Sequence, residues 1–272
     1  MKTLLICHTG DKMNEVGLAR WLASFSDLAG IIVLRETNQR IWRRIRREIK
    51  RVGARRFPDV LAFRLYYRLV HAGRDRRWEE MRLREVCETY PDLDPSTPVL
   101  YTSSPNSSEA LEFIRSARPD IMIARCKTLL KENIFTVPAS GTFVMHPGIC
   151  PEYRNAHGCF WALANGDSGR VGMTLLRIDK GVDTGAVYGY YTCHFDEVKE
   201  SHAVIQQRVV FDNLEALRQK FEEIHAGRAQ TIDTTGRASA TWGQPWLSRY
   251  LLWKWRARRE KRESESHIAA VS

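Results

Sequence analysis

His146 and Asp183 are the two side chains of this sequence whose types and settings best suit acid–base chemistry. His146 ends a short apolar run and is followed at once by Pro147 and Gly148, which predicts a strand that stops abruptly with an imidazole at its tip. Asp183 lies in a glycine-bounded loop after a second predicted strand, residues 171–178. An imidazole titrates near neutral pH, and a nearby carboxylate stabilises its protonated form and fixes its tautomer. The pair could therefore move a proton during a transfer reaction.

An alternation of strand-like and helix-like segments surrounds these residues and would position them. Strands are expected at 3–9, 31–34, 98–102, 119–124, 142–146 and 171–178, and helices at 15–25, 107–118, 159–164 and 199–225. This order predicts an α/β fold with a Rossmann-like, mostly parallel sheet. Such sheets bind ligands at the carboxyl ends of their strands. No Gly-x-Gly-x-x-Gly follows the first strand, which disfavours a dinucleotide cofactor.

Several motifs around His146 and Asp183 resemble, in order and spacing, those of the formyltetrahydrofolate-dependent formyltransferases. They are His-Pro-Gly at 146–148, Pro-x-Tyr-Arg at 151–154, Trp-Ala-Leu-x-x-Gly at 161–166, Val-Gly-Met-Thr at 171–174 and Asp-x-Gly-Val-Asp-Thr-Gly at 179–185. The resemblance is clear over 98–189 and implies a formyltransferase fold. It also implies 10-formyltetrahydrofolate as the formyl donor, a primary amine as the acceptor, and His146 and Asp183 as catalytic residues.

The same resemblance implies where the formyl donor binds. In that family the loop after the fourth strand binds the pterin through backbone groups, while its apolar side chains wall the pocket. Thr128, Leu129 and Leu130 occupy that loop here, and Asp179 and Val182 lie in the second loop. We expect these five residues to form the binding site for the donor.

One departure from the family pattern concerns the oxyanion that forms during formyl transfer. The pattern has Asn two residues before the catalytic His as an amide donor, and this chain has Val144. Losing one such donor costs roughly 2.7–4 kcal/mol. Asn155 or His157 could replace the amide; the pocket could instead hydrolyse the formyl donor; or the chain could be a binding protein without activity. The retention of His146 and Asp183 favours formyl transfer.

The net charge of +10 is concentrated in two segments outside the predicted catalytic core. Residues 1–230 are expected to form the catalytic domain, with a basic helical insertion at about 36–94. Within the insertion, Ile41, Trp42 and Ile45 begin an apolar stripe among arginines, and Pro58 can start a second helix. This stripe could pack on the domain or lie on an anionic membrane.

Residues 231–272 are expected to form a C-terminal hairpin, at 231–241, and a basic aromatic tail. In this tail Trp242, Trp246, Tyr250, Trp253 and Trp255 precede a basic cluster. Aromatic residues beside Arg and Lys favour an interfacial membrane helix over nucleic acid, because no RNA-binding fold accompanies them. The last ten residues are expected to be disordered.

Composition and length narrow the remaining expectations. No apolar window of about 18 residues is present, so no bilayer-spanning segment is expected. The six cysteines are scattered, which argues against a zinc site and a disulfide framework and favours a reducing, cytoplasmic setting. The two basic segments add the inner face of a membrane as the expected location. About forty residues follow residue 231, too few for the β-barrel that methionyl-tRNA formyltransferases use, so tRNA is not expected. A membrane-apposed enzyme would meet a nucleotide- or lipid-linked amino sugar.

Overall fold

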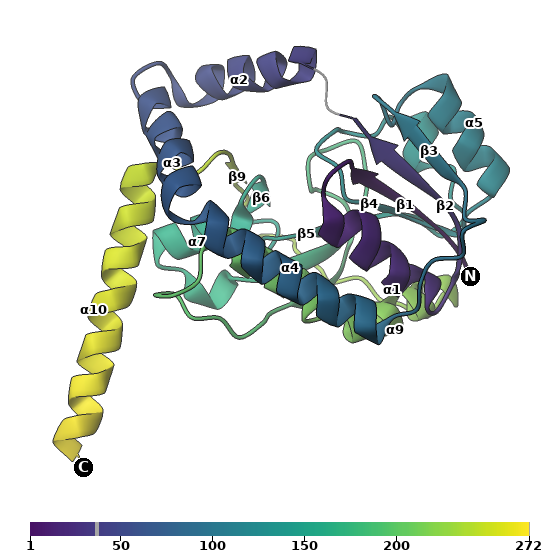
Figure 1. Ribbon diagram of the computed structural model, residues 1–272. Coiled ribbons are helices and arrows are strands. Elements are labelled where there is room, and N and C mark those ends of the chain that lie inside the picture. Colours follow the sequence, from purple (N-terminus) through teal and green to yellow (C-terminus); the bar gives the residue numbers. More distant parts are fainter. Residues whose placement is uncertain (36–37, 272) are drawn as a thin grey trace.

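In the computed structural model, a seven-stranded sheet runs through the molecule and carries helices on both faces (Figure 1). The structure describes residues 1–35 and 38–271, without the side chains of 38–41, 43, 44, 47 and 267–271. The strand order is β3 (Val99–Thr102), β2 (Asp27–Leu34), β1 (Lys2–His8), β4 (Ile121–Ala124), β5 (Gly141–His146), β7 (Met173–Arg177) and β8 (Val187–Tyr191). The first five of these strands pair in parallel, and β7 runs antiparallel to both of its neighbours, β5 and β8, which confirms the mostly parallel α/β prediction.

Alternating side chains of β1 show how the sheet is buried on both faces. Leu5 and Cys7 point into the larger apolar core, and Leu4 and Ile6 point into a smaller one on the opposite face. The larger core is covered by the elements η1 (Met13–Leu18), α1 (Ala19–Ala23), α4 (Ala72–Thr89), α7 (Gly158–Asn165), α8 (His202–Phe211) and α9 (Leu214–His225). The smaller core is covered by α5 (Ser108–Ala117) and α6 (Glu132–Phe135). Ser107 caps α5 as expected, since its side chain accepts a hydrogen bond from the amide of Ala110.

The single helix predicted at 199–225 is wrong, because the segment forms two helices. α8 ends at Phe211 and α9 begins at Leu214. Between them, the side chain of Asn213 donates to the carbonyls of Thr192 and Val209. Asn competes well with the backbone for such bonds and so favours a helix break.

The expected insertion contains the two predicted helices, α2 (Asn38–Val52) and α3 (Phe57–Val70). It also contains a third helix, α4. α4 packs on η1 and α8 and contributes Val86 to the larger core. α4 thus lies within the expected insertion of about 36–94 and packs on the elements outside it. On α2, Trp42 is exposed, while the side chains of Ile41, Arg43, Arg44 and Arg47 lie outside the described residues.

Instead of forming a hairpin of its own, the C-terminal segment pairs with strands that precede residue 231. β9 (Thr241–Trp242) lies parallel to β6 (Arg154–Asn155), and Ile232 bridges to Val187 of β8. The predicted disorder at 263–272 is also wrong as far as residue 271, because α10 runs from Leu247 to Val271. None of the helices in the described part of the chain combines the length and the apolar character that a membrane crossing requires.

Most of the tail's aromatic residues are packed inside the molecule, not presented to a membrane. The Trp242 ring stacks on that of Trp161 with centroids 4.8 Å apart, and Trp246 meets the same ring edge-on. Tyr250 and Trp253 are fully buried in the larger core. Among the described tail aromatics, Trp255 alone is exposed.

Candidate active site

The structure brings His146 and Asp183 together, although 37 positions separate them in the chain. His146 closes β5, and its antiparallel partner in β7 is Thr174. The loop that leaves β7 returns Asp183 to the end of β5, where Asp183 Oδ2 lies 3.5 Å from His146 Nδ1. Both side chains are largely buried. A carboxylate at this distance would stabilise an imidazolium, so the pair can accept and return a proton.

The second nitrogen of His146 fixes the tautomer of the neutral ring. Nε2 lies 2.8 Å from the carbonyl oxygen of Tyr153, and because a carbonyl only accepts, Nε2 carries the hydrogen. In the neutral ring Nδ1 therefore holds the lone pair, on the side of Asp183. Gly148 and Gly158 make room for this arrangement: a Cβ on Gly148 would lie 2.8 Å from His146 Nε2 and 2.9 Å from Gly158 Cα.

The loop at 178–186 is held in shape by Asp179. Its carboxylate accepts from the Gly181 amide at 2.9 Å and from the Thr184 hydroxyl at 2.8 Å. Gly185 is required because a Cβ there would overlap the Arg177 carbonyl oxygen, at 1.8 Å. Asp179 also lines the predicted donor pocket, so it both orders the loop and contributes to the pocket wall.

A pocket opens between this loop and the loop after β4, at the place where the sequence predicts binding of the formyl donor. Thr128, Leu129 and Leu130 line one side, Val144 lies at the β5 wall, and Asp183 is at the rim. Asn106 holds the first loop, because its side chain donates to the Leu129 carbonyl (2.9 Å) and accepts from the Lys131 amide (2.8 Å). Leu129 and Leu130 give the pocket an apolar wall, whereas the Leu129 carbonyl and the Lys131 amide are engaged by Asn106.

Val182 does not line the pocket. Its carbonyl instead accepts a hydrogen bond from Arg154 Nη1 at 3.0 Å, which ties the loop to β6. The structure thus gives Val182 a role in holding the loop, whereas the sequence suggested a contact with the donor.

Asn155 lies beside Asp183, but through its backbone. Its amide N–H donates to Asp183 Oδ2 at 2.7 Å, and its side-chain amide donates to the Trp242 carbonyl in β9. The side chain is therefore engaged away from the pocket, and Asn155 is not among the pocket-lining residues. This geometry weighs against Asn155 as the replacement for the missing amide.

His157 is also turned away from the pocket. Its ring packs against His202 of α8, with centroids 5.6 Å apart, and burial together with the charge of Lys127 lowers its pKa to about 4. It is not among the pocket-lining residues. Asn155, His157 and Asp183 all have positive φ, at 77°, 57° and 51°. Such strained backbone persists where the surroundings fix it, and it often marks functional loops.

Arg125 lies next to the end of β5 and was assigned no role from the sequence; it is not among the residues that line the pocket. It follows β4, where its Nε donates to Asn14 Oδ1 at 2.9 Å and its Nη1 donates to the Met145 carbonyl, next to His146. Burial lowers the pKa of this guanidinium. A cation fixed beside the end of β5 suits a site in which negative charge develops. The sequence feature that could have identified Arg125 is its position directly after the predicted buried strand at 119–124.

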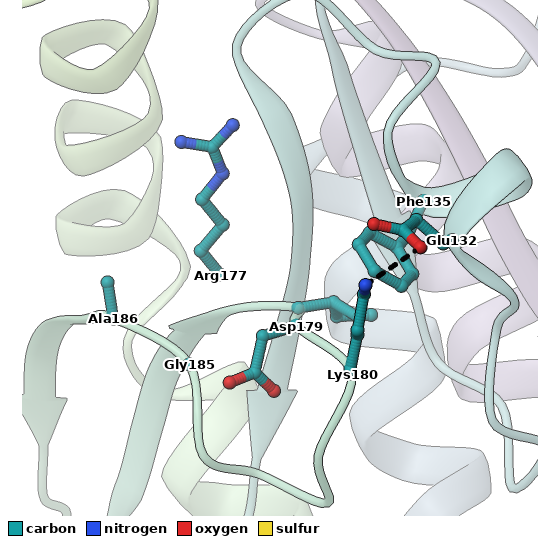
Figure 2. Close-up of a pocket in the computed structure, with 8 residues that line it drawn as sticks. Glu132, Phe135, Arg177, Asp179, Lys180, Gly185 and Ala186 are labelled. Carbon is teal, nitrogen blue, oxygen red and sulfur yellow. Dashed lines mark ion pairs between the residues drawn. The ribbon is translucent and has the colours of Figure 1, made fainter.

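A second hollow lies next to the donor pocket and shares the 177–185 segment with it. Figure 2 shows Lys180 reaching Glu132 of α6, at 3.0 Å, while Arg177 points away from this ion pair. Both partners of the pair are mostly exposed, so it contributes little to stability. Phe135 and Ile178 form the apolar part of the hollow. Across the described residues, no three His, Cys, Asp or Glu side chains gather as metal ligands.

Comparison with curated proteins gives relatives that share part of their length with this chain. A methionyl-tRNA formyltransferase from Thermotoga maritima is 29% identical over 159 residues, which cover 58% of this chain and 49% of that protein. The bifunctional polymyxin resistance protein ArnA from Wigglesworthia glossinidia brevipalpis is 26% identical over 144 residues, 53% of this chain and 22% of that protein. The chain thus spans about half, or less, of the length of these relatives.

Solved structures share the fold. A sugar N-formyltransferase from a Shewanella species superposes with a TM-score of 0.53 at 12% identity, covering 89% of this chain and 77% of that one. A phosphoribosylglycinamide formyltransferase from Anaplasma phagocytophilum gives a TM-score of 0.52 at 13% identity, covering 90% and 99%. The family model described as formyl transferase matches residues 71–220, which include α4, His146 and Asp183. With more than half of its residues inside that match, the chain belongs to the formyl transferase family.

Proposed function

We propose that this chain transfers a formyl group from 10-formyltetrahydrofolate to a primary amine. The observation that carries the proposal is the pairing of His146 Nδ1 with Asp183 Oδ2, at 3.5 Å, where Asp183 itself lines the pocket formed by 128–130, 176–181 and 183–185. The apolar wall of Leu129 and Leu130 and the backbone groups of the loop would hold the donor. When bound, 10-formyltetrahydrofolate supplies the formyl group.

His146 is the proton carrier in this proposal. Attack by a neutral amine forms the new C–N bond and leaves a proton on nitrogen, which His146 can accept at Nδ1 because Nε2 already carries a hydrogen. Asp183 stabilises the resulting imidazolium. The same proton is returned to the departing nitrogen when the old C–N bond breaks. Asn155 assists indirectly, because its amide N–H holds Asp183 Oδ2.

The oxyanion formed during transfer needs a donor, and Val144 offers none. With Asn155 bonded to Trp242 and His157 packed against His202, we infer that protonated His146 and the positive charge of Arg125 provide this stabilisation. A site with fewer directed donors than the family pattern should be slow, and its rate should depend strongly on both cations.

An amino sugar, linked to a nucleotide or to a lipid carrier, is the acceptor class that we propose. The fold shared with the Shewanella sugar N-formyltransferase supports this choice. The named activity of the Thermotoga relative makes a charged tRNA the competing acceptor. We further propose a cytoplasmic enzyme that works at the inner, anionic face of a membrane, in keeping with the surplus of basic residues in the insertion and tail.

The test is consumption of 10-formyltetrahydrofolate by the purified chain, with and without amines. Amine-dependent release of tetrahydrofolate that is abolished in His146→Ala would support formyl transfer. Consumption at the same rate without any amine would establish a hydrolase instead, and no consumption with any amine would leave only binding. Competition between a nucleotide-linked amino sugar and aminoacylated initiator tRNA would decide the acceptor class.

A further inference from the structure

Two neighbouring helices outside the catalytic core carry an exposed apolar surface. α3 and α10 lie side by side at the end of the molecule that is farthest from β3 and α5 (Figure 1). On α3, Leu61, Leu65 and Leu69 are 48%, 60% and 75% exposed, at the spacing of one helix face. We call these residues, together with Leu251, Leu252 and Trp255 of α10, the α3–α10 ridge.

The inward faces of both helices are already buried, so the ridge cannot turn into the body. α3 buries Val60 and Phe63, and α10 buries Tyr250, Trp253 and Ala257. The Phe63 and Tyr250 rings meet at 5.3 Å, and the Ser248 hydroxyl donates to Asp59 at 2.5 Å, which fixes the two helices against each other. The outward leucines therefore remain in solvent because of how the helices pack. Six exposed apolar side chains on two adjoining helices exceed the single exposed residues that are ordinary on a protein surface, and such groups mark interaction sites.

The charges beside the ridge are nearly all positive. Arg64 and Arg68 are exposed on α3, and Arg249, Arg258 and Arg259 are exposed on α10. Along α10 the apolar stripe leads directly into basic residues: Leu251 and Trp255 are followed at helical spacing by Arg258, Arg259 and Arg262. The Arg259 guanidinium lies 5.0 Å from the Trp255 ring centroid. Within the described residues, Glu263 is the one acidic partner of these arginines, at 3.4 Å from Arg259.

We propose that the α3–α10 ridge docks on an anionic lipid bilayer surface, with its leucines and Trp255 entering the acyl boundary and its arginines meeting the phosphates. This inference gives a site to the membrane association in the proposed function and does not depend on the formyl-transfer chemistry. A second copy of the same face is disfavoured, since a two-fold pairing would bring the arginines of both copies together. Nucleic acid would leave the leucines without partners.

A series of contacts links α3, which carries half of the ridge, to the loop that holds Asp183. Gln244, between β9 and α10, accepts from Arg64 of α3 at 3.5 Å, and β9 itself pairs with β6 next to Asp183. Docking through the ridge would therefore hold the active site near the lipid surface. An acceptor carried on a membrane lipid could then reach the site without leaving the bilayer.

The experiment is sedimentation of the full chain with vesicles of phosphatidylcholine alone or mixed with phosphatidylglycerol. We expect binding only to the mixed vesicles, weakening as salt rises. Leu65→Gln/Leu69→Gln/Trp255→Gln, and separately Arg68→Glu/Arg258→Glu, should each weaken binding at least tenfold. Met81→Gln is the matched control, because Met81 is an exposed apolar residue on α4, away from the ridge.

Three vesicle results would overturn the inference, and so would a fourth result on the oligomeric state. They are absence of binding to mixed vesicles, equal binding to neutral vesicles, and unchanged binding by both ridge variants. If the wild-type chain proves dimeric without lipid and the leucine variant monomeric, the ridge is an interface between copies. Formyl transfer to a soluble amine, measured on the same variants, should be unchanged, so that failure of docking and failure of the chemistry remain separate.

Discussion

The Val144→Asn substitution returns an amide to the position from which the family pattern donates to the oxyanion. Val144 lines the donor pocket on β5, two residues before His146, so both side chains point to the same face of the sheet. One directed donor to an oxyanion contributes roughly 2.7–4 kcal/mol to transition-state stabilisation. The kcat/KM for formyl transfer should therefore rise by about two to three orders of magnitude.

The substitution should leave the protein folded. Val144 is half-buried and packs against the cluster of Cys150, Leu176 and Val187, so an Asn loses apolar contacts there. The expected loss in the free energy of unfolding is about 1–2 kcal/mol, well below the roughly 5–15 kcal/mol of a typical domain. Thermal unfolding of the variant would verify this before the rates are compared.

The assay follows the release of tetrahydrofolate in the presence of a saturating amine. Val144→Leu is the size-matched control without a donor and should stay at or below the wild-type rate. Val144→Asn combined with His146→Ala should lose most of the gain, because no proton carrier remains. If folded Val144→Asn stays within twofold of the wild type, the oxyanion already has a directed donor, and the inferred reliance on His146 and Arg125 is wrong.

Three further predictions concern the surroundings of the catalytic pair. Asp183→Asn removes the carboxylate beside His146 Nδ1 and should lower kcat about a hundredfold or more with little change in donor affinity, as steady-state kinetics would reveal. Gly148→Ala should lower kcat at least tenfold, because the new Cβ would lie 2.5 Å from the Tyr153 carbonyl oxygen and 2.8 Å from His146 Nε2; an unchanged rate would contradict the described ring position. Burial lowers the pKa of His157 to about 4 and also lowers the pKa of His202. In the unfolded chain both histidines have the ordinary pKa of about 6.5, so below that pH the unfolded chain binds more protons than the folded one. Stability should thus be complete above pH 6.5 and fall as pH drops towards 4, by up to about 3 kcal/mol for His157, and thermal unfolding of His157→Asn should show a flatter pH dependence.

The central part of the fold was predictable from local patterns. Buried parallel strands appear in sequence as short apolar runs, and Pro147-Gly148 gives β5 a clear end. His146 and Asp183 could be paired in advance from the order and spacing of the motifs that carry them. The strands alone would not have shown it, because β7 runs antiparallel to β5 and Asp183 reaches His146 only through the loop that returns after β7. β6 and β9 could not be predicted, since each has two residues and exists only through pairing with the other.

The directions in which the side chains of Asn155 and His157 point could not be predicted from the sequence. Both residues have positive φ, which turns the chain in a way that residue type does not specify. Asn155 reaches Trp242, 87 positions later, and His157 reaches His202 on α8. The polar character of the loop was apparent, whereas the partners that draw these groups away from the pocket come from distant segments.

The tail shows why composition alone misassigned its aromatic residues. A run of Trp, Tyr and Arg has the same pattern whether its rings enter a bilayer or a protein core, because both environments favour burial of the ring and a polar edge. The deciding fact is a partner elsewhere in the chain: Trp161 stacks on Trp242, and its Nε1–H donates to the Gly243 carbonyl at 2.9 Å. Only the side of α10 that finds no such partner, at Leu251, Leu252 and Trp255, remains for another surface.

The same C-terminal segment therefore has two separable effects on the molecule. Through β9 it supports the catalytic loop: Trp242 accepts from Asn155, and Arg237 holds Glu152 through two hydrogen bonds of 3.0 and 2.7 Å. Through α10 it contributes half of the α3–α10 ridge. Deleting the segment would remove both the support of the catalytic loop and half of the ridge. Loss of activity in a truncated chain would therefore not test membrane docking. Substitutions confined to the ridge leave β9 in place, and for this reason they alone can distinguish docking from catalysis.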